Sequence, residues 1–425
     1  MSWLYNYRAL LTGVIRVAAA LPLATMASLT QAASPPPADG LRLALTAAVS
    51  RNPAVRNKLA DLRALGFKVE EAQAARYPSL TVQAQSMSEQ TSHGVARVQQ
   101  PLYAFGRIDG AIELAGMQTV LGQMSVLDVR RKLLEDTAAS YVGLLGARAK
   151  LILAERNVDE HQRLFQMIQR RHEGGIASEA DARLASSRLI QAKTLLEQLR
   201  GQVDKGENEL FALTRLTLPG RESVEPTLTE LPNLSALLSL ADTSVSLVRQ
   251  RQAELDLARV QATQRRAELM PTLYARWEHD IAPAAGSLNT HRVGVVLEAS
   301  IDGFGLVAKP RLAAEAERIA AAQENLEAAR NETTRRLTGL LSDRQTQQLL
   351  VTANESAVQA VEETLASFLR QYDAGRKSWV DVLNTQREMS DARQQLQAVR
   401  TAWQENSLRI AALLGMLDVV AEMAP

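Results

Sequence analysis

The chain contains an internal repeat in which corresponding residues lie about 200 positions apart. The segment QYDAGRKSWVDVLN at residues 371–384 matches RRHEGGIASEADARLA at residues 170–185. The matched pairs are Glu173 and Asp373, Gly175 and Gly375, Ser178 and Ser378, and Asp181 and Asp381. A repeat of this length predicts that one structural unit occurs twice, so the fold must contain two related halves.

The prolines divide the chain in the same way. No proline occurs at residues 102–218 or 311–424, and shorter windows without proline run over 54–77 and 233–270. Because proline interrupts helices, a long window without it favours long helices. Aromatic residues make up only 4% of the chain, which is typical of helices packed through small side chains. The proline pattern therefore predicts that each half contains a short helical segment followed by a long one.

Each long window predicts a helical hairpin. Apolar residues recur at helical spacing without a strict heptad, and charges every few residues argue against membrane-spanning helices. Gly174, Gly175 and Gly375 can end the first helix of each hairpin, and Ser178 and Ser378 can cap the second. A single turn of this kind is an ordinary connection between helices. Its occurrence in both halves favours a shared role.

Segments that alternate with a period of two precede each hairpin and predict strands. In the first half, Leu80 and Val82 alternate with Thr81 and Gln83, and residues 272–301 alternate in the second half. The apolar faces would pack on helices in a soluble protein or face lipid in a transmembrane barrel, and the pattern fits both. Four strands cannot close a barrel and open edges are costly in lipid, so a barrel requires several copies of the chain.

The N-terminus predicts export from the cytoplasm. Arg8 and Arg16 accompany the apolar segment VAAALPLATMASL, and small residues near Ala33 suit signal cleavage, although a buried helix is the alternative. The chain has no cysteine, which excludes disulfides, thiolate metal sites and acylation of a lipobox cysteine. The net charge is +1 without a basic cluster, so we expect no nucleic-acid partner.

We predict the following boundaries. The signal peptide covers 1–33, the first repeat 34–220, the linker 221–235 and the second repeat 236–425. The first repeat has a helix at 41–77, strands at 78–103 and a long helical hairpin at 106–216. The second repeat has a helix at 236–269, strands at 271–301 and a long helical hairpin at 306–417.

Four segments together resemble one known family. They are residues 44–80, QQPLYAFGRI at 99–108, its counterpart ASIDGFG at 299–305, and YDAGRKSWVDVLNTQREMSDARQQL at 372–396. In this order they resemble the TolC-like outer-membrane efflux and secretion proteins. The resemblance implies a mainly α fold with a small transmembrane β part. Three protomers would form a twelve-stranded β-barrel in the outer membrane of a Gram-negative bacterium and a twelve-helix tunnel in the periplasm.

The resemblance also implies a function. The trimer would be the passive exit duct of a tripartite system for type I protein secretion or multidrug efflux, without enzymatic activity or a cofactor. A periplasmic adaptor and an inner-membrane pump of the ABC or RND type would open it. The lack of a lipidation cysteine mildly favours the secretion branch or a general duct, but the cargo can be protein, drug or metal. The adaptor would contact the helix tips: Gly174, Gly175, Ile176, Ala177, Ser178, Gly375, Arg376, Lys377 and Ser378.

Asp381 and Asn384 are the candidate gate residues. Asp381 matches an aspartate with which the family can ring the tunnel entrance, whereas Asn384 stands where several relatives carry a second aspartate. In a trimer, three close carboxylates would favour bound cations or raised pKa values. Because Asn384 leaves the entrance with one ring of carboxylates rather than two, the expectation of strong block by cations is weaker. Alternatively, Asp381 is a solvated residue that suits a helix N-terminus. Arg376 and Lys377 either pair with acidic groups of the adaptor or are solvated turn charges.

Other candidate sites are weaker. His279 and His291 flank a loop and form either a metal site at a pore mouth or ordinary polar loop residues. Trp277 is either an interfacial residue or part of a core. We find no Walker A, GxSxG, HExxH or GxGxxG motif. The alternative functions are a periplasmic adaptor, which usually carries one hairpin rather than two, and an exported coiled-coil scaffold.

Overall fold

The computed structural model describes residues 40–86, 92–217, 231–232, 234–281, 291–300 and 306–422. Asp39–Pro425 form one compact unit, so the two repeats pack on each other rather than forming separate bodies. The predicted signal peptide lies outside the described residues, as do residues 221–230 and 233 of the predicted linker.

The unit is mainly helical, as the sequence predicted. The helices of the first half are α1 (Gly40–Arg51), α2 (Pro53–Ala74), α3 (Arg107–Glu173) and α4 (Glu179–Thr214). Those of the second half are α5 (Leu234–Ser244), α6 (Ser246–Ala267), α7 (Ala308–Asp373), α8 (Trp379–Leu413) and the short α9 (Leu417–Val420). None of the described helices is long and apolar enough to cross a membrane.

Two segments that we expected to be single helices are each divided. The segment expected at 41–77 breaks at Asn52, because Pro53 has no N–H for a continuous helix and the Asn52 side chain accepts a bond from the Ala54 N–H instead. The segment expected at 236–269 breaks at Val245, whose backbone is extended with φ −65° and ψ 130°. Helix α5 begins at Leu234, two residues inside the predicted linker.

The strands form one antiparallel sheet in the order β1-β2-β3-β4. Their bounds are β1 (Ser79–Ser86), β2 (Ser92–Tyr103), β3 (Thr272–Asp280) and β4 (His291–Glu298). Pairing of β2 with β3 joins the two halves of the chain. The register aligns apolar Leu80, Val98, Trp277 and Val293 in one row across all four strands.

The next row of the sheet is polar and aligns Thr81, Arg97, Glu278 and Arg292. Arg97 Nε lies 2.6 Å from Glu278 Oε1, and Arg292 Nη2 lies 3.5 Å from Glu278 Oε2. The sheet therefore has one apolar and one polar face, in agreement with the period-two alternation of the sequence.

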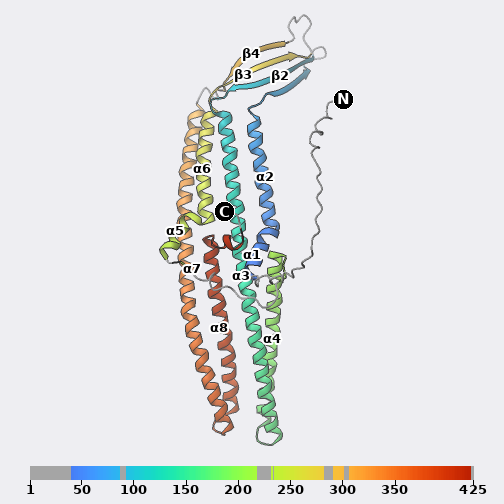
Figure 1. Ribbon diagram of the computed structural model, residues 1–425, viewed down its shortest axis with the longest axis vertical. Coiled ribbons are helices and arrows are strands. Elements are labelled where there is room, and N and C mark those ends of the chain that lie inside the picture. The colour runs from blue at the N-terminus through green and yellow to red at the C-terminus, as the bar shows by residue number, and fades with distance from the viewer. Residues whose placement is uncertain are drawn as a thin grey trace, which may run out of the picture. The chain divides into compact units, whose positions relative to one another are not determined.

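The helices follow the lateral order of the strands. Near the sheet, α2 packs on α3, α3 on α6, and α6 on α7 (Figure 1). Farther from the sheet, α4 packs on α3, α3 on α8, and α8 on α7. Helices α3 and α7 belong to both sets, because they extend from the sheet to the far end (Figure 1). The turns that join α3 to α4 and α7 to α8 lie at the end opposite the sheet (Figure 1).

The main hydrophobic cores lie where the helices near the sheet meet the helices farther from it. In one core, Leu41 and Leu45 of α1 pack against Leu134 and Tyr141 of α3 and Leu408 of α8. A second core joins α5, α6, α7 and α8. The cores fix the two hairpins relative to the sheet and so position the helix tips.

Candidate functional site at the helix tips

The two helix tips have the same backbone geometry. Gly175 and Gly375 adopt φ values of 72° and 71°, a left-handed conformation that favours glycine. The N–H of Ile176 donates to Arg171 O at 2.8 Å, and that of Arg376 donates to Gln371 O at 2.8 Å. The internal repeat of the sequence is thus a repeated turn.

A capping box starts the second helix of each hairpin. The Asp181 N–H donates to Ser178 Oγ at 3.1 Å, and the Asp381 N–H donates to Ser378 Oγ at 3.2 Å. The hydroxyl groups donate in return to Asp181 Oδ2 at 2.7 Å and Asp381 Oδ2 at 2.8 Å. Within the protomer, Asp381 therefore caps α8, which fits the helix-terminus interpretation that the sequence left open.

The electrostatics of Asp381 follow from this cap. The hydrogen bond from the Ser378 hydroxyl, followed by the charge of Lys377, lowers the pKa of Asp381 below its ordinary value of 3.8. Lys377 Nζ lies 3.5 Å from Asp381 Oδ2. The carboxylate is therefore charged at neutral pH, as a residue that attracts cations at an entrance must be.

Side chains link the two hairpins near the tips. Arg171 Nη2 at the end of α3 lies 2.8 Å from Asp373 Oδ1 at the end of α7, and its guanidinium lies 4.6 Å from the centre of the Tyr372 ring. Asn384, the second candidate gate residue, accepts a hydrogen bond from Arg188 Nη2 of α4 at 3.3 Å. These contacts tie α3 to α7 and α4 to α8.

Sequence reasoning missed Arg171, Asp373 and Arg188 as linking residues. Their partners lie 202 and 196 positions away, close to the repeat length. Because the two halves pack side by side, residues separated by one repeat meet at the tips. The repeat length was therefore a usable signal for these pairs.

A hydrophobic core lies directly behind the tips. It joins both hairpins and consists of Leu164, Ile168, Ala185, Trp379, Val382 and Leu383. Trp379 is only 3% exposed, and its ring packs 5.1 Å from that of Tyr372. The tips are thus held by packing as well as by charges.

The outermost residues of the two tips differ in chemistry. Ile176 is 79% exposed on the first tip, and Arg376 is exposed on the second. Lys377 is held back on its own hairpin, because its Nζ lies 4.2 Å from the centre of the Phe368 ring. Of the two cations considered for adaptor contact, Arg376 is the more accessible.

His279 and His291 form a cross-strand pair at the ends of β3 and β4. The rings of His279 and His291 lie 6.3 Å apart, and Trp277 stacks on His279 at 5.9 Å. In the part of the chain that the structure describes, no group of three or more His, Cys, Asp or Glu side chains is arranged to hold a metal ion. Glu278 and Asp280 instead pair with arginines of the sheet.

Comparison with known proteins agrees with this architecture. A family model described as "Outer membrane efflux protein" matches residues 44–214 and 237–416. Outer membrane protein TolC of Salmonella enteritidis is 23% identical over 404 residues, which cover 86% of this chain and 80% of that protein.

Two solved structures show the same fold. The structure of CusC has a TM-score of 0.76 at 18% identity and covers 88% of this chain and 92% of its own. The open state of the MtrE outer membrane channel of Neisseria gonorrhoeae has a TM-score of 0.72 at 18% identity and covers 89% of each chain. The expected resemblance to TolC-like proteins and the outer-membrane location are thereby confirmed. The protein belongs to the outer membrane efflux protein family.

Proposed function

We propose that this chain forms, as a homotrimer, the passive exit duct of a tripartite export system. The observation that carries the proposal is the pair of open sheet edges. In the described chain, β1 pairs with β2 alone and β4 with β3 alone. Each unpaired backbone group costs several kcal/mol in lipid, so the sheet needs further copies to close.

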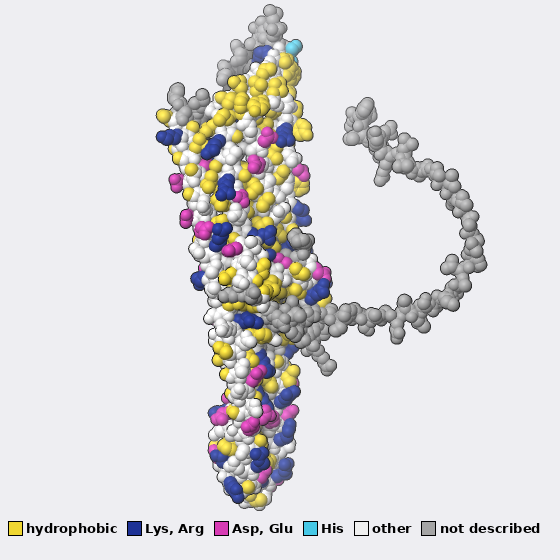
Figure 2. All heavy atoms as spheres, turned by 60° about the vertical axis from the view of Figure 1, so that its left-hand side comes forward, with side chains coloured by type: hydrophobic (Ala, Val, Ile, Leu, Met, Phe, Trp, Pro, Cys, Tyr) yellow, Lys and Arg dark blue, Asp and Glu magenta, His cyan; other side chains and the backbone are white. Residues whose placement is uncertain are grey.

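The apolar face of the sheet supports a lipid environment. Leu80, Val82, Val293, Val295 and Leu297 lie on this face and are between 61% and 80% exposed. Hydrophobic side chains gather towards the sheet end of the unit, whereas charged side chains are spread along the helices (Figure 2). In a closed barrel this face contacts outer-membrane lipid and the polar face lines the lumen.

The outer helices also support association of copies. No residue of α7 after Leu337 is buried, and Leu349 and Leu350 are exposed. At the opposite edge, Phe67 of α2 and Ile190 of α4 are exposed. In a ring, α7 of one copy would pack against α2 and α4 of the next and continue the helical wall.

The helix tips are the proposed periplasmic entrance. Asp381 and Asn384 would form its narrowest levels. Ile176 and Arg376, with the rest of the segments 174–178 and 375–378, would contact a periplasmic adaptor coupled to an ABC or RND-type pump. The links between the hairpins support this assignment, because contacts that hold the tips together can be released when the entrance opens.

The test is the behaviour of the purified protein. We expect it in the outer-membrane fraction, with detergent needed for extraction and a mass in detergent that corresponds to three chains. In planar bilayers it should form ion-conducting channels. A stable monomer that is soluble in the periplasm would contradict the duct and favour the scaffold or adaptor alternative.

The cargo belongs to the same proposal. Type I protein secretion and multidrug efflux both fit a wide passive duct, because such a duct binds its cargo weakly. Loss of the gene should remove specific proteins from the medium in the first case and raise sensitivity to several drugs in the second. Sensitivity to metals alone would contradict both cargo classes.

A further inference from the structure

A buried histidine, His161, lies on α3 about 18 Å along the helix from its last residue, Glu173. It is only 4% exposed, and its Nδ1 has no hydrogen-bond partner in the described part of the chain. One turn nearer the tip, Leu164 belongs to the same core as Ala185 of α4 and Leu383 of α8. The imidazole ring therefore lies where α3 packs on both α4 and α8.

A polar link between α4 and α8 lies at the same level. Arg188 follows Ala185 by three positions and Asn384 follows Leu383 directly, and Arg188 Nη2 donates to Asn384 Oδ1 at 3.3 Å. Arg188 Nη1 donates to Gln191 Oε1 at 3.0 Å. Both acceptors are neutral amides, so these bonds leave the guanidinium charge without a carboxylate partner.

The charged groups around the ring come from all three helices. Burial lowers the pKa of His161 below its ordinary value of 6.5, Glu160 of α3 opposes this effect, and Arg188 of α4 adds to it. Glu160 is already engaged by α8, because Gln386 Nε2 donates to its Oε2 and Arg393 Nη1 lies 3.5 Å from its Oε1. At this level α8 therefore contributes an amide and a cation.

We propose that His161 is a positioning residue of the entrance, whose neutral ring holds α4 and α8 together and whose protonation weakens their link. A protonated ring would place a second positive charge beside Arg188, and the nearby carboxylate, Glu160, is already shared with Gln386 and Arg393. Burying such a charge is costly, and separating α4 from α8 would let water reach it. Mild acid would therefore favour the open entrance. The inference rests on the proposed duct, in which the tips form that entrance.

The test is the open-to-closed ratio of the intact trimer in planar bilayers at about pH 7.5 and about pH 5.5. Because the closed tips lower the pKa of His161, the neutral ring favours closure above about pH 6.5. This advantage is lost as the pH falls from about 6.5 towards the lowered pKa. The ratio for the unmodified channel should therefore be about three-fold or more higher at the lower pH.

Three variants separate the ring from other titrating groups. His161→Gln should remove the response to pH, because an amide does not titrate. Arg188→Gln should raise the open-to-closed ratio at about pH 7.5 through loss of the link, and should reduce the further rise in acid. His172→Gln is the matched control, because His172 is an exposed histidine of the same helix, and it should keep the response.

A histidine NMR titration of the trimer in detergent gives an independent measurement. The ring signal that is missing in His161→Gln should titrate in the unmodified protein with a midpoint below about 6.5. If His161→Gln fails to assemble, His161→Phe and Arg188→Gln decide the question. An equal response to pH in the unmodified and variant channels, or none in the unmodified channel, would overturn the proposal. Absence of channels at both pH values would instead contradict the duct itself.

Discussion

Asp381 and Asp181 occupy equivalent positions in the two halves and make the same capping contacts. Helix capping accounts for the presence of an aspartate at both positions. A ring of carboxylates at the proposed entrance would involve Asp381 alone. The two roles are compatible, because a capping carboxylate at an exposed helix start remains charged. The equivalent residue in the first half offers an internal control that separates them.

Replacing Asp381→Asn should fray the start of α8. Because the folded chain lowers the pKa of Asp381, the charged cap contributes stability above the ordinary value of 3.8 and loses it as the pH falls through the lowered folded-state pKa. Amide hydrogen exchange at residues 379–383 should therefore be faster in the variant at pH 7 and equal to that of the unmodified protein in strong acid.

Asp181→Asn should cause the same fraying at residues 179–183. If Asp381 lines the entrance, only Asp381→Asn should also change the single-channel conductance or its block by divalent cations. Equal conductance for both variants and the unmodified channel would leave Asp381 with the capping role alone.

At the scale of elements, the two hairpins are joined by packing and by a few polar links. Helix α3 packs on α4 and on α8 along much of its length, and the tips add the contact of Arg171 with Asp373 and Tyr372. Packing is hard to change in small steps, but single polar links can break without loss of the fold. The links are therefore the adjustable part of the proposed entrance.

Arg171→Gln should favour the open entrance. A partly exposed ion pair contributes about 0.2–1 kcal/mol and a cation over an aromatic ring about 0.5–1 kcal/mol. Losing both should raise the open-to-closed ratio about three- to thirty-fold in bilayer recordings. Asp373→Asn should give a smaller change that is not additive with Arg171→Gln. Arg183→Gln, which breaks an exposed pair within α4, should have no effect.

Two glycines of α3 should respond oppositely to alanine. A Cβ at Gly146 would collide with the Thr401 side chain of α8, whereas a Cβ at Gly143 meets nothing within 4 Å. Gly146→Ala should therefore destabilise the protein by about 1–3 kcal/mol through overpacking. Gly143→Ala should stabilise it by about 0.5–1 kcal/mol through helix propensity. Denaturant unfolding in detergent measures both, and equal effects would contradict the close contact of α3 with α8.

At the scale of the whole molecule, the sheet and the two sets of helices each end in unpartnered edges within the described residues. Strand β1 and helices α2 and α4 form one edge, and strand β4 and helix α7 form the other. The edges carry exposed apolar side chains at both levels. In a ring of copies, one edge of each protomer packs against the other edge of its neighbour. The same interface, repeated around the symmetry axis, covers every exposed edge.

Engineered cysteines should report this contact, since the natural chain has none. Cysteines at Leu80 or Val82 of β1, each combined with one at Val293 or Val295 of β4, lie on opposite edges of the protomer sheet. Oxidation in the membrane should produce covalent dimers and trimers for the best-aligned pair. Single-cysteine variants are the control and should give no covalent trimer. Monomers alone from every pair would contradict the ring.

Local sequence signals predicted most of the elements. Glycines and serines placed both turns, because turn and cap chemistry act over a few residues, and period-two alternation identified the strands and their two faces. Pro53 marks the division at Asn52 in the same local way, because proline has no N–H for a continuous helix. The repeat of these signals revealed the two-fold internal organisation.

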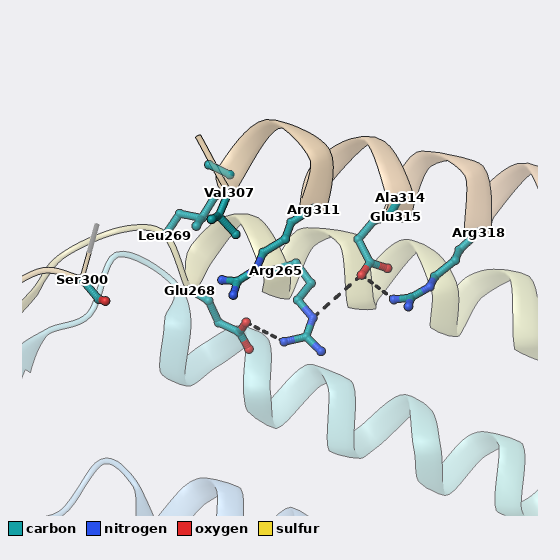
Figure 3. A pocket seen from close by; sticks show the side chains of 10 residues that line it. Arg265, Glu268, Leu269, Ser300, Val307, Arg311, Ala314, Glu315 and Arg318 are labelled. Carbon is teal, nitrogen blue, oxygen red and sulfur yellow. Dashed lines mark hydrogen bonds and ion pairs between the residues drawn. The ribbon is translucent and has the colours of Figure 1, made fainter. Parts of the chain in front are cut away.

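Tertiary structure alone decided which of these elements meet. Arg171 and Asp373 are separated by 202 positions, and no local pattern distinguishes them from the many solvated charges of the long helices. Likewise, Arg265 near the end of α6 and Glu315 near the start of α7 line one cavity only because these two helices converge beside the sheet (Figure 3). By itself, the sequence determined the repeated units, because periodicity and turn chemistry are local. Their lateral order and the side chains that face one another depended on packing between distant segments.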